Sequence, residues 1–151
     1  MTREHITTTE SETFELGVSL GSHAARGDVF AITGDLGAGK TVLAKGIAKG
    51  MGVDDEVTSP TFSLLEIYER PLPLYHFDLY RIERTDELDH LCFEEYWEGD
   101  GVSVIEWAER WPLLNPEPAP PTAAASRALR RVWIEIIGDT QRRIYHEDPG
   151  A

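Results

Sequence analysis

A glycine-rich loop placed after a short apolar run is the feature that most constrains how this chain can fold. The loop, GDLGAGKT at residues 34–41, follows the apolar run Val29–Thr33 and matches the pattern G-x-x-x-x-G-K-[ST]. Such a run is typical of a buried strand. After the loop, apolar residues recur every four positions until glycines end the run, which predicts a helix over about residues 39–50. The sequence therefore predicts an α/β fold with a phosphate-binding loop between a strand and a helix.

The residue types of the loop indicate its chemistry. Glycines let the backbone form a nest whose N–H groups point at phosphate oxygens, and the start of the next helix adds about half a positive charge. In this pattern Lys40 reaches the β- and γ-phosphates, and the Thr41 hydroxyl ligates Mg²⁺. We therefore predict that the chain binds a nucleotide.

A metal site of this kind also needs an acidic group at the carboxyl end of a neighbouring strand. Two residues qualify: Asp78 follows the imperfect apolar run 74–77, and Glu106 ends the run 102–105. For either residue alone, a surface carboxylate at a strand end is the alternative. His76 alternates with its neighbours in a strand-like run, so we interpret it as a packed histidine behind the site rather than a general base.

The rest of the chain predicts further elements around this unit. Thr9 and Glu12 have the spacing of a capping box, which predicts a helix over about residues 11–26. Strand-like runs at residues 62–68 and 74–80 are joined by a link too short for a parallel crossover, so they predict a hairpin and a mixed sheet. Further patterns predict one or two short helices within 85–97 and a strand at 102–107. The runs 132–137 and 142–146 predict a last pair of strands around a turn at 138–140.

Two segments without regular periodicity remain. Residues 115–130 are rich in proline and alanine, and the first part, NPEPAPPTAAAS, holds four of the nine prolines, so we predict a flexible surface loop, with a docking arm as the alternative. Ser59-Pro60-Thr61 predicts a stiff turn between the loop helix and the next strand. Switch segments of nucleotide hydrolases lie at this place, although an ordinary turn has the same composition.

Length and charge limit the possible functions. The 151 residues suit one domain, and no apolar stretch is long enough to span a bilayer. The net charge of -13, with 14 basic against 27 acidic residues, argues against direct binding of bare nucleic acid and allows a basic protein partner. Cys92 stands alone and no signal pattern precedes the first helix, which fits a protein of the cytoplasm.

Four motifs in this order resemble the bacterial TsaE family: GDLGAGKT at 34–41, TSPTF at 58–62, HFDLYR at 76–81 and VIEW at 104–107. The resemblance covers roughly residues 6–110, and other P-loop families share only the first motif. It implies a small single-domain P-loop ATPase, residues 1–151, with a mixed parallel and antiparallel sheet flanked by helices. It also implies cytoplasmic work beside the TsaB and TsaD proteins in N6-threonylcarbamoylation of adenosine 37 of tRNA, with only indirect contact to the tRNA and no membrane.

The resemblance also implies roles for individual residues. Lys40, Asp78 and Glu106 would be catalytic, and Mg²⁺ would be held by Thr41 and Glu106, with Asp78 in the Walker-B-like place. Thr61 would lie in a switch-like turn and Trp107 beside the site. The residues expected to bind ATP are Gly34, Leu36, Gly37, Ala38, Gly39, Lys40, Thr41 and Thr61, with Glu10 and Arg142 as candidates for contacts with the adenine.

The chain departs from the family pattern at two places. Val42 stands where the family usually has a second threonine, which removes a hydroxyl near the α-phosphate and should cost about 0.5 to 1.5 kcal/mol of nucleotide binding. Ala108 stands where a proline is common.

Two other functions remain open from the residues. A nucleotide-sensing adaptor would use ATP only to change its affinity for a partner. A small-metabolite kinase would need an arginine-rich lid, and the one arginine cluster of the chain is Arg127, Arg130 and Arg131. The P-loop pattern alone does not separate these functions from ATP hydrolysis.

Overall fold

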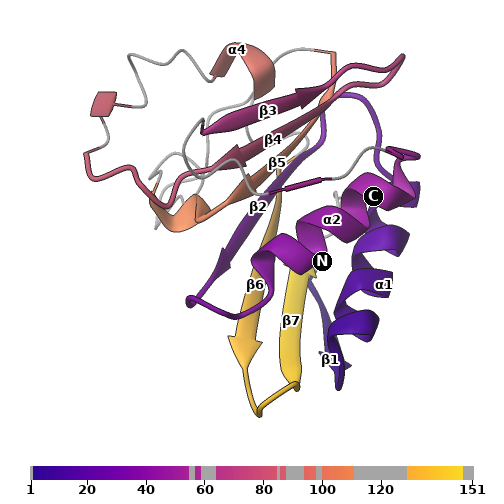
Figure 1. The fold of residues 1–151 in the computed structure, drawn as a ribbon, viewed down its shortest axis with the longest axis vertical. Helices are drawn as coiled ribbons and strands as arrows, with labels where there is room; N and C mark the ends of the chain where they lie inside the picture. The colour runs from indigo at the N-terminus through magenta and orange to yellow at the C-terminus, as the bar shows by residue number, and fades with distance from the viewer. Residues whose placement is uncertain are drawn as a thin grey trace.

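The computed structural model describes residues 2–54, 57–58, 64–84, 86–87, 94–97, 100–110 and 129–147. Seven strands form one mixed sheet in the order β1-β7-β6-β2-β5-β4-β3 (Figure 1). The strands are β1 (Thr2–Thr7), β2 (Val29–Gly34), β3 (Leu65–Tyr68), β4 (Leu74–Asp78), β5 (Val102–Glu106), β6 (Leu129–Ile136) and β7 (Arg142–Glu147). The helices are α1 (Glu10–Ser22), α2 (Lys40–Gly50), the short α4 (Glu94–Trp97) and the 3₁₀ helix η1 (Ala108–Arg110).

The predicted mixed sheet is confirmed. The central strand β2 pairs in parallel with β5 and β6, and β4 pairs in parallel with β5. Both predicted hairpins, β3–β4 and β6–β7, are antiparallel. The parallel strands β2, β4 and β5 therefore end at the same edge of the sheet, where the glycine loop also begins.

The edge strand β1 was not predicted. It pairs antiparallel with β7, from Thr2 opposite Glu147 to Thr7 opposite Arg142. Its sequence, TREHIT, contains a single large aliphatic residue, Ile6, and that residue is 51% exposed. The apolar pattern that marks a buried strand is absent because β1 is held chiefly by backbone pairing to β7.

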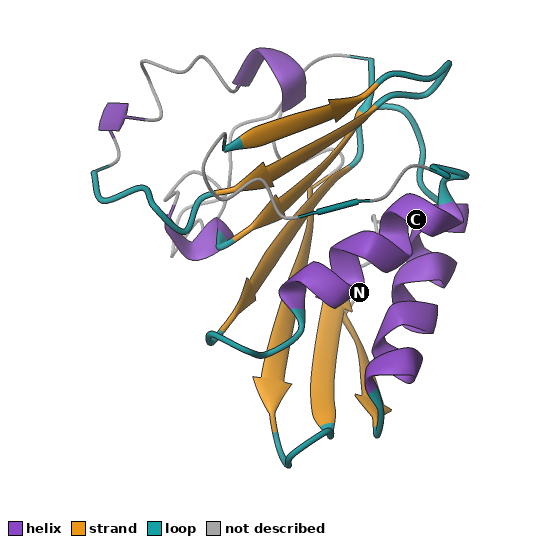
Figure 2. Ribbon diagram, viewed as in Figure 1, coloured by secondary structure: helices purple, strands orange, loops and turns teal. Residues whose placement is uncertain are grey.

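Helices α1 and α2 lie side by side on one face of the sheet (Figures 1 and 2). Glycines let their backbones touch. A Cβ on Gly21 of α1 would lie 2.0 Å from the Ile47 carbonyl oxygen, and one on Gly46 of α2 would lie 2.2 Å from the Phe14 carbonyl oxygen. Real Cβ atoms do not approach this closely, so each helix fixes the position of the other, and α1 positions the helix that starts at the glycine loop.

Strand β2 is buried on both sides. Phe30 and Ile32 point into the larger core, which packs against α1 and α2, whereas Val29 and Ala31 point into a second core on the other face. Coverage of both faces explains why the strand reads as a continuous apolar run. Strand β2, which leads into the glycine loop, is therefore anchored between two buried clusters of apolar side chains.

Several predicted boundaries move. The predicted helix 11–26 ends at Ser22, because the chain turns there and the Asp28 carboxylate accepts the Ala25 N–H at 2.8 Å. The predicted strand 74–80 ends at Asp78, whose side chain accepts the Tyr80 N–H at 2.9 Å.

At the other end of the chain, β6 begins at Leu129, so the last two residues of the predicted loop 115–130 belong to a strand. Pairing with β2 extends β6 this far, since Leu129 lies opposite Val29. Residues 115–128, the turn 59–61 and Cys92 lie outside the described residues. Within the described ranges, no helix is long and apolar enough to cross a bilayer.

Candidate functional site

The glycine loop joins the end of β2 to the start of α2. Gly37 and Gly39 have φ angles of 82° and 110°, which lie in the left-handed region that other residues rarely adopt. Gly39 is also the N-cap of α2, so the first N–H groups of the helix face the loop. The backbone thus has the nest-like form that the sequence pattern predicts for phosphate binding.

Lys40 is buried, with 5% of its surface exposed. Its ammonium group donates hydrogen bonds to the carbonyl oxygens of Gly34 and, at 2.9 Å, Asp35, and it lies 3.8 Å from the centre of the Trp107 ring. Burial lowers the pKa of Lys40, and nearby carboxylates, Glu109 first among them, oppose that shift. Burial also raises the pKa of Glu109, and the positive charge of Lys40 lowers it in part toward its ordinary value. The site holds the ammonium group out of water at the place where a phosphate would lie.

Glu106 connects the glycine loop to β4. Its carboxylate accepts a hydrogen bond from the Thr41 hydroxyl at 2.7 Å and another from the His76 ring nitrogen Nε2 at 2.6 Å. Glu106 and His76 are 2% and 1% exposed. The acceptor role of the carboxylate places the hydrogen of His76 on Nε2. His76 therefore lies behind Glu106 and holds it toward Thr41, as the interpretation of a packed histidine predicts.

Asp78 lies beside Glu106, because the parallel register of β4 and β5 sets the two residues opposite each other. Asp78 is 3% exposed. Both carboxylates and Thr41 line a cavity of about 430 Å³ together with Lys40 and Trp107. The fold brings together residues that are far apart in the sequence, and the two acidic candidates meet at one place.

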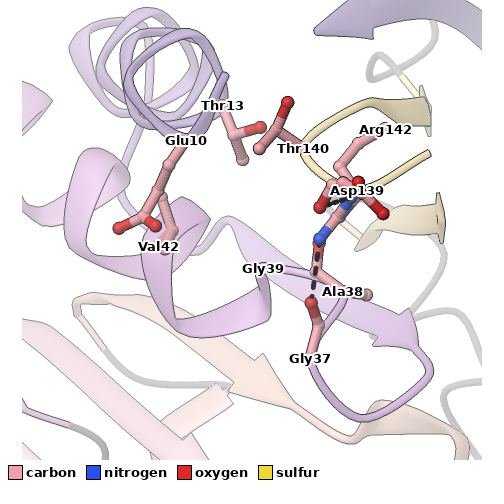
Figure 3. Close-up of a pocket in the computed structure, with 9 residues that line it drawn as sticks. All are labelled: Glu10, Thr13, Gly37, Ala38, Gly39, Val42, Asp139, Thr140 and Arg142. Atoms are coloured by element: carbon pink, nitrogen blue, oxygen red, sulfur yellow. Dashed lines mark hydrogen bonds between the residues drawn. The ribbon is translucent and has the colours of Figure 1, made fainter. Parts of the chain in front are cut away.

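A second, smaller cavity of about 150 Å³ borders the glycine loop (Figure 3). The two cavities share Gly37, Gly39 and Val42. Besides Ala38 of the loop, the new lining residues come from the start of α1 and from the β6–β7 turn with the start of β7: Glu10, Thr13, Asp139, Thr140 and Arg142.

Arg142 has a role that the sequence did not predict. Its guanidinium group donates to the carbonyl oxygens of Ala38 at 2.8 Å and Gly37 at 3.2 Å (Figure 3). It also donates to the Gly138 carbonyl oxygen at 3.0 Å. Arg142 thus lines the smaller cavity and also ties the glycine loop to the β6–β7 turn. Arg142 thereby satisfies the carbonyl oxygens of Gly37 and Ala38, while the Ala38 N–H donates to the Asp35 carbonyl oxygen at 3.0 Å within the loop.

Most of the predicted site residues meet at these two cavities. Their linings include Leu36, Gly37, Ala38, Gly39, Lys40, Thr41, Asp78, Glu106, Glu10 and Arg142. Gly34 lies just behind them and accepts a hydrogen bond from Lys40. Thr61 lies outside the described residues.

Sequence reasoning missed other lining residues, namely Thr13, Tyr80, Asp139 and Thr140, and the neighbouring Glu109. Nothing in the local sequence indicates that these residues line a binding site. Asp139 and Thr140 follow Gly138 in a turn that the sequence does predict, but only the order of the strands places this turn beside the glycine loop.

Comparison with known proteins agrees with this geometry. The family described as threonylcarbamoyl adenosine biosynthesis protein TsaE matches residues 7–144. A Bacillus subtilis protein named tRNA threonylcarbamoyladenosine biosynthesis protein TsaE is 45% identical over 139 residues, which cover 91% of this chain and 80% of the relative. A Nostoc protein of the same name is 45% identical over 117 residues, 74% of this chain and 71% of its own length.

A solved structure is similar as well. The crystal structure of Bacillus subtilis YdiB superposes with a TM-score of 0.76 at 32% sequence identity, covering 99% of this chain and 87% of that chain. The family match covers most of the chain, and the fold is that of a P-loop nucleotide-binding protein. The chain belongs to the TsaE family of tRNA threonylcarbamoyladenosine biosynthesis proteins.

Proposed function

We propose that the chain binds ATP with Mg²⁺ and hydrolyses it as the ATPase component of tRNA threonylcarbamoyladenosine synthesis. It would work in the cytoplasm with the TsaB and TsaD proteins and would not transfer the group itself. The observation that carries this proposal is the convergence of Lys40, Thr41 and Glu106 on one cavity at the end of β2.

The donor set fits magnesium. Mg²⁺ prefers oxygen ligands and is commonly held by one or two carboxylates together with water and phosphate oxygens. Thr41 and Glu106, already 2.7 Å apart, would hold the ion, with Asp78 beside them. Within the described residues no cluster of three or more His, Cys, Asp or Glu could hold a metal alone, which suits an ion that depends on the nucleotide. When bound, the ion would neutralise charge on the β- and γ-phosphates.

The residues of the chain would do the remaining work. The N–H groups at Gly37 and Gly39 and the start of α2 would surround the phosphates. Lys40 would exchange its contacts with Gly34 and Asp35 for phosphate oxygens. Trp107, which lies against Lys40, would exclude water from one side of that contact.

Two observations support slow hydrolysis by the chain alone and completion of the site by a partner. Among the described residues, no arginine lines the larger cavity. An arginine aimed at the transferred phosphate is worth about 10³ to 10⁵ in rate, so a partner would have to supply an equivalent group. Leu36 and Tyr80, on the rim of this cavity, are 73% and 42% exposed, and such apolar side chains suit coverage by a partner protein.

The test combines calorimetry with an ATPase assay. We expect the purified chain to bind Mg²⁺·ATP, and Lys40→Ala to weaken binding by about 10- to 100-fold because a charged hydrogen-bond donor to phosphate is lost. Lys45→Ala removes an exposed lysine of the same helix and should leave binding unchanged. ATP turnover should be slow alone and rise when TsaB and TsaD are added. Equal binding by the Lys40→Ala and Lys45→Ala variants, or rapid turnover by the isolated chain, would contradict the proposal.

A further inference from the structure

A third cavity lies apart from the nucleotide site. It has a volume of about 370 Å³ and is enclosed by β1, α1, β6 and β7. Arg130 lines it from the start of β6, beside Phe30 near the beginning of β2. The glycine loop follows the opposite end of β2. None of the residues that line this cavity belongs to either of the two cavities described above.

The lining is basic although the chain is acidic. Five of its residues are Arg3, His5, His23, Arg130 and His146, and the described lining contains no carboxylate. Three of the five histidines of a chain with net charge -13 therefore meet in one place. The remaining wall is formed by Ser19 and by two leucines, Leu16 and Leu20. A basic cavity with an apolar wall matches a small organic anion.

Arg130 retains capacity for a further hydrogen bond. Its side chain is 12% exposed, and its Nη2 atom lies 3.4 Å from the carboxylate of Asp28. Its Nε atom is buried and, among the described residues, has no hydrogen-bond partner. A buried guanidinium N–H without an acceptor is costly, and a rotation of the side chain toward the cavity would let a bound anion accept from it.

The histidines bring further hydrogen-bonding groups to the cavity. The Nε2 atoms of His5 and His146 lie 2.9 Å apart in rings stacked at 10°, so one nitrogen donates and the other accepts. His23 donates from Nδ1 to the Ser19 carbonyl oxygen at 2.9 Å. Arg3 and Arg130 supply positive charge to the same lining.

We propose that this cavity binds a small organic anion through a phosphate or carboxylate head group. The head group would lie among the arginines and histidines, with any apolar part against Leu16 and Leu20. The groups that face the site are Arg3 and His5 from β1, His23 after α1, Arg130 from β6 and His146 from β7, with Asp28 beside Arg130.

The experiment is a titration of the ¹⁵N-labelled full chain followed by NMR, with sodium sulfate and sodium acetate as probes. Both anions are ionised at neutral pH. We expect saturable shifts of the amides of Ser19, His23 and His146 as either anion is added. Binding of sulfate at the glycine loop would shift Gly37 and Gly39 instead, so the two sites are read separately.

Variants decide whether the cavity is responsible. Arg3→Gln combined with His23→Gln changes two exposed residues and should reduce the affinity at least about fivefold. Arg130→Gln should do the same from the buried side. Arg84→Gln removes an arginine that is 75% exposed and outside the cavity, and should bind as the wild type does. Amide shifts that grow linearly with anion concentration without saturation would overturn the proposal. So would an apparent Kd that is the same in both cavity variants as in the wild type.

Discussion

At the scale of single residues, the burial of Lys40 gives nucleotide binding a pH dependence. Its pKa lies below the ordinary value of 10.5 because burial disfavours the ammonium form. Phosphate binds the ammonium form, so the affinity is lost as the pH rises through the lowered pKa. We expect the affinity for Mg²⁺·ATP to fall several-fold as the pH is raised from neutral toward 10.5, the ordinary pKa of lysine. Lys40→Arg stays charged over this range, and calorimetry should show a much smaller fall for it.

His76 is the second residue with a testable role. It donates to Glu106 from a fully buried position, so its removal leaves a carboxylate oxygen without a partner. His76→Leu should weaken Mn²⁺ binding in the presence of ATP by about tenfold, the usual effect of losing the residue behind a metal ligand. His76→Gln, whose amide can donate from a similar position, should recover part of the loss. Mn²⁺ binding is followed by electron paramagnetic resonance, and metal-free ATP binding is the control that should not change.

At the scale of elements, the contact between α1 and α2 depends on glycine. Gly46→Ala places a methyl group where the Phe14 carbonyl oxygen lies 2.2 Å away. Separating the helices should cost about 1 to 3 kcal/mol, which exceeds the gain of up to about 1 kcal/mol from better helix propensity. Urea unfolding should therefore show a loss of stability. Lys45→Ala, at an exposed position of the same helix, should change little, and equal stability of the two variants would show that the helices are free to shift.

At the scale of the whole molecule, the net charge of -13 limits contact with tRNA. Binding of bare nucleic acid is dominated by lysine and arginine contacts with phosphate, and this chain has 14 such residues against 27 acidic ones. We expect fluorescence anisotropy to show no binding of labelled tRNA by the isolated chain below about 100 µM at physiological salt. The complex with TsaB and TsaD should bind it. Salt-sensitive binding of tRNA at micromolar concentration by the chain alone would contradict this prediction.

Local patterns in the amino-acid sequence were enough to predict the centre of the fold. Three local patterns mark this centre: an apolar run, a loop whose glycines can adopt a left-handed backbone, and a four-residue apolar periodicity. Because each pattern lies within a few consecutive residues, β2, the glycine loop and α2 were predicted nearly to the residue. The candidates Asp78 and Glu106 were also visible, because an acidic residue at the end of an apolar run is a local signal.

The tertiary structure decided which of these residues act together. The register of β4 with β5 sets Asp78 opposite Glu106, and a hydrogen bond across 65 positions of sequence joins Glu106 to Thr41. The strand order brings Arg142 to the glycine loop and the cavity histidines to one another. Strand β1 forms because its backbone pairs with the edge of β7, and the sequence of β1 alone does not predict this pairing. Long-range pairing, unlike backbone conformation or periodicity, depends on the whole chain and leaves no local pattern.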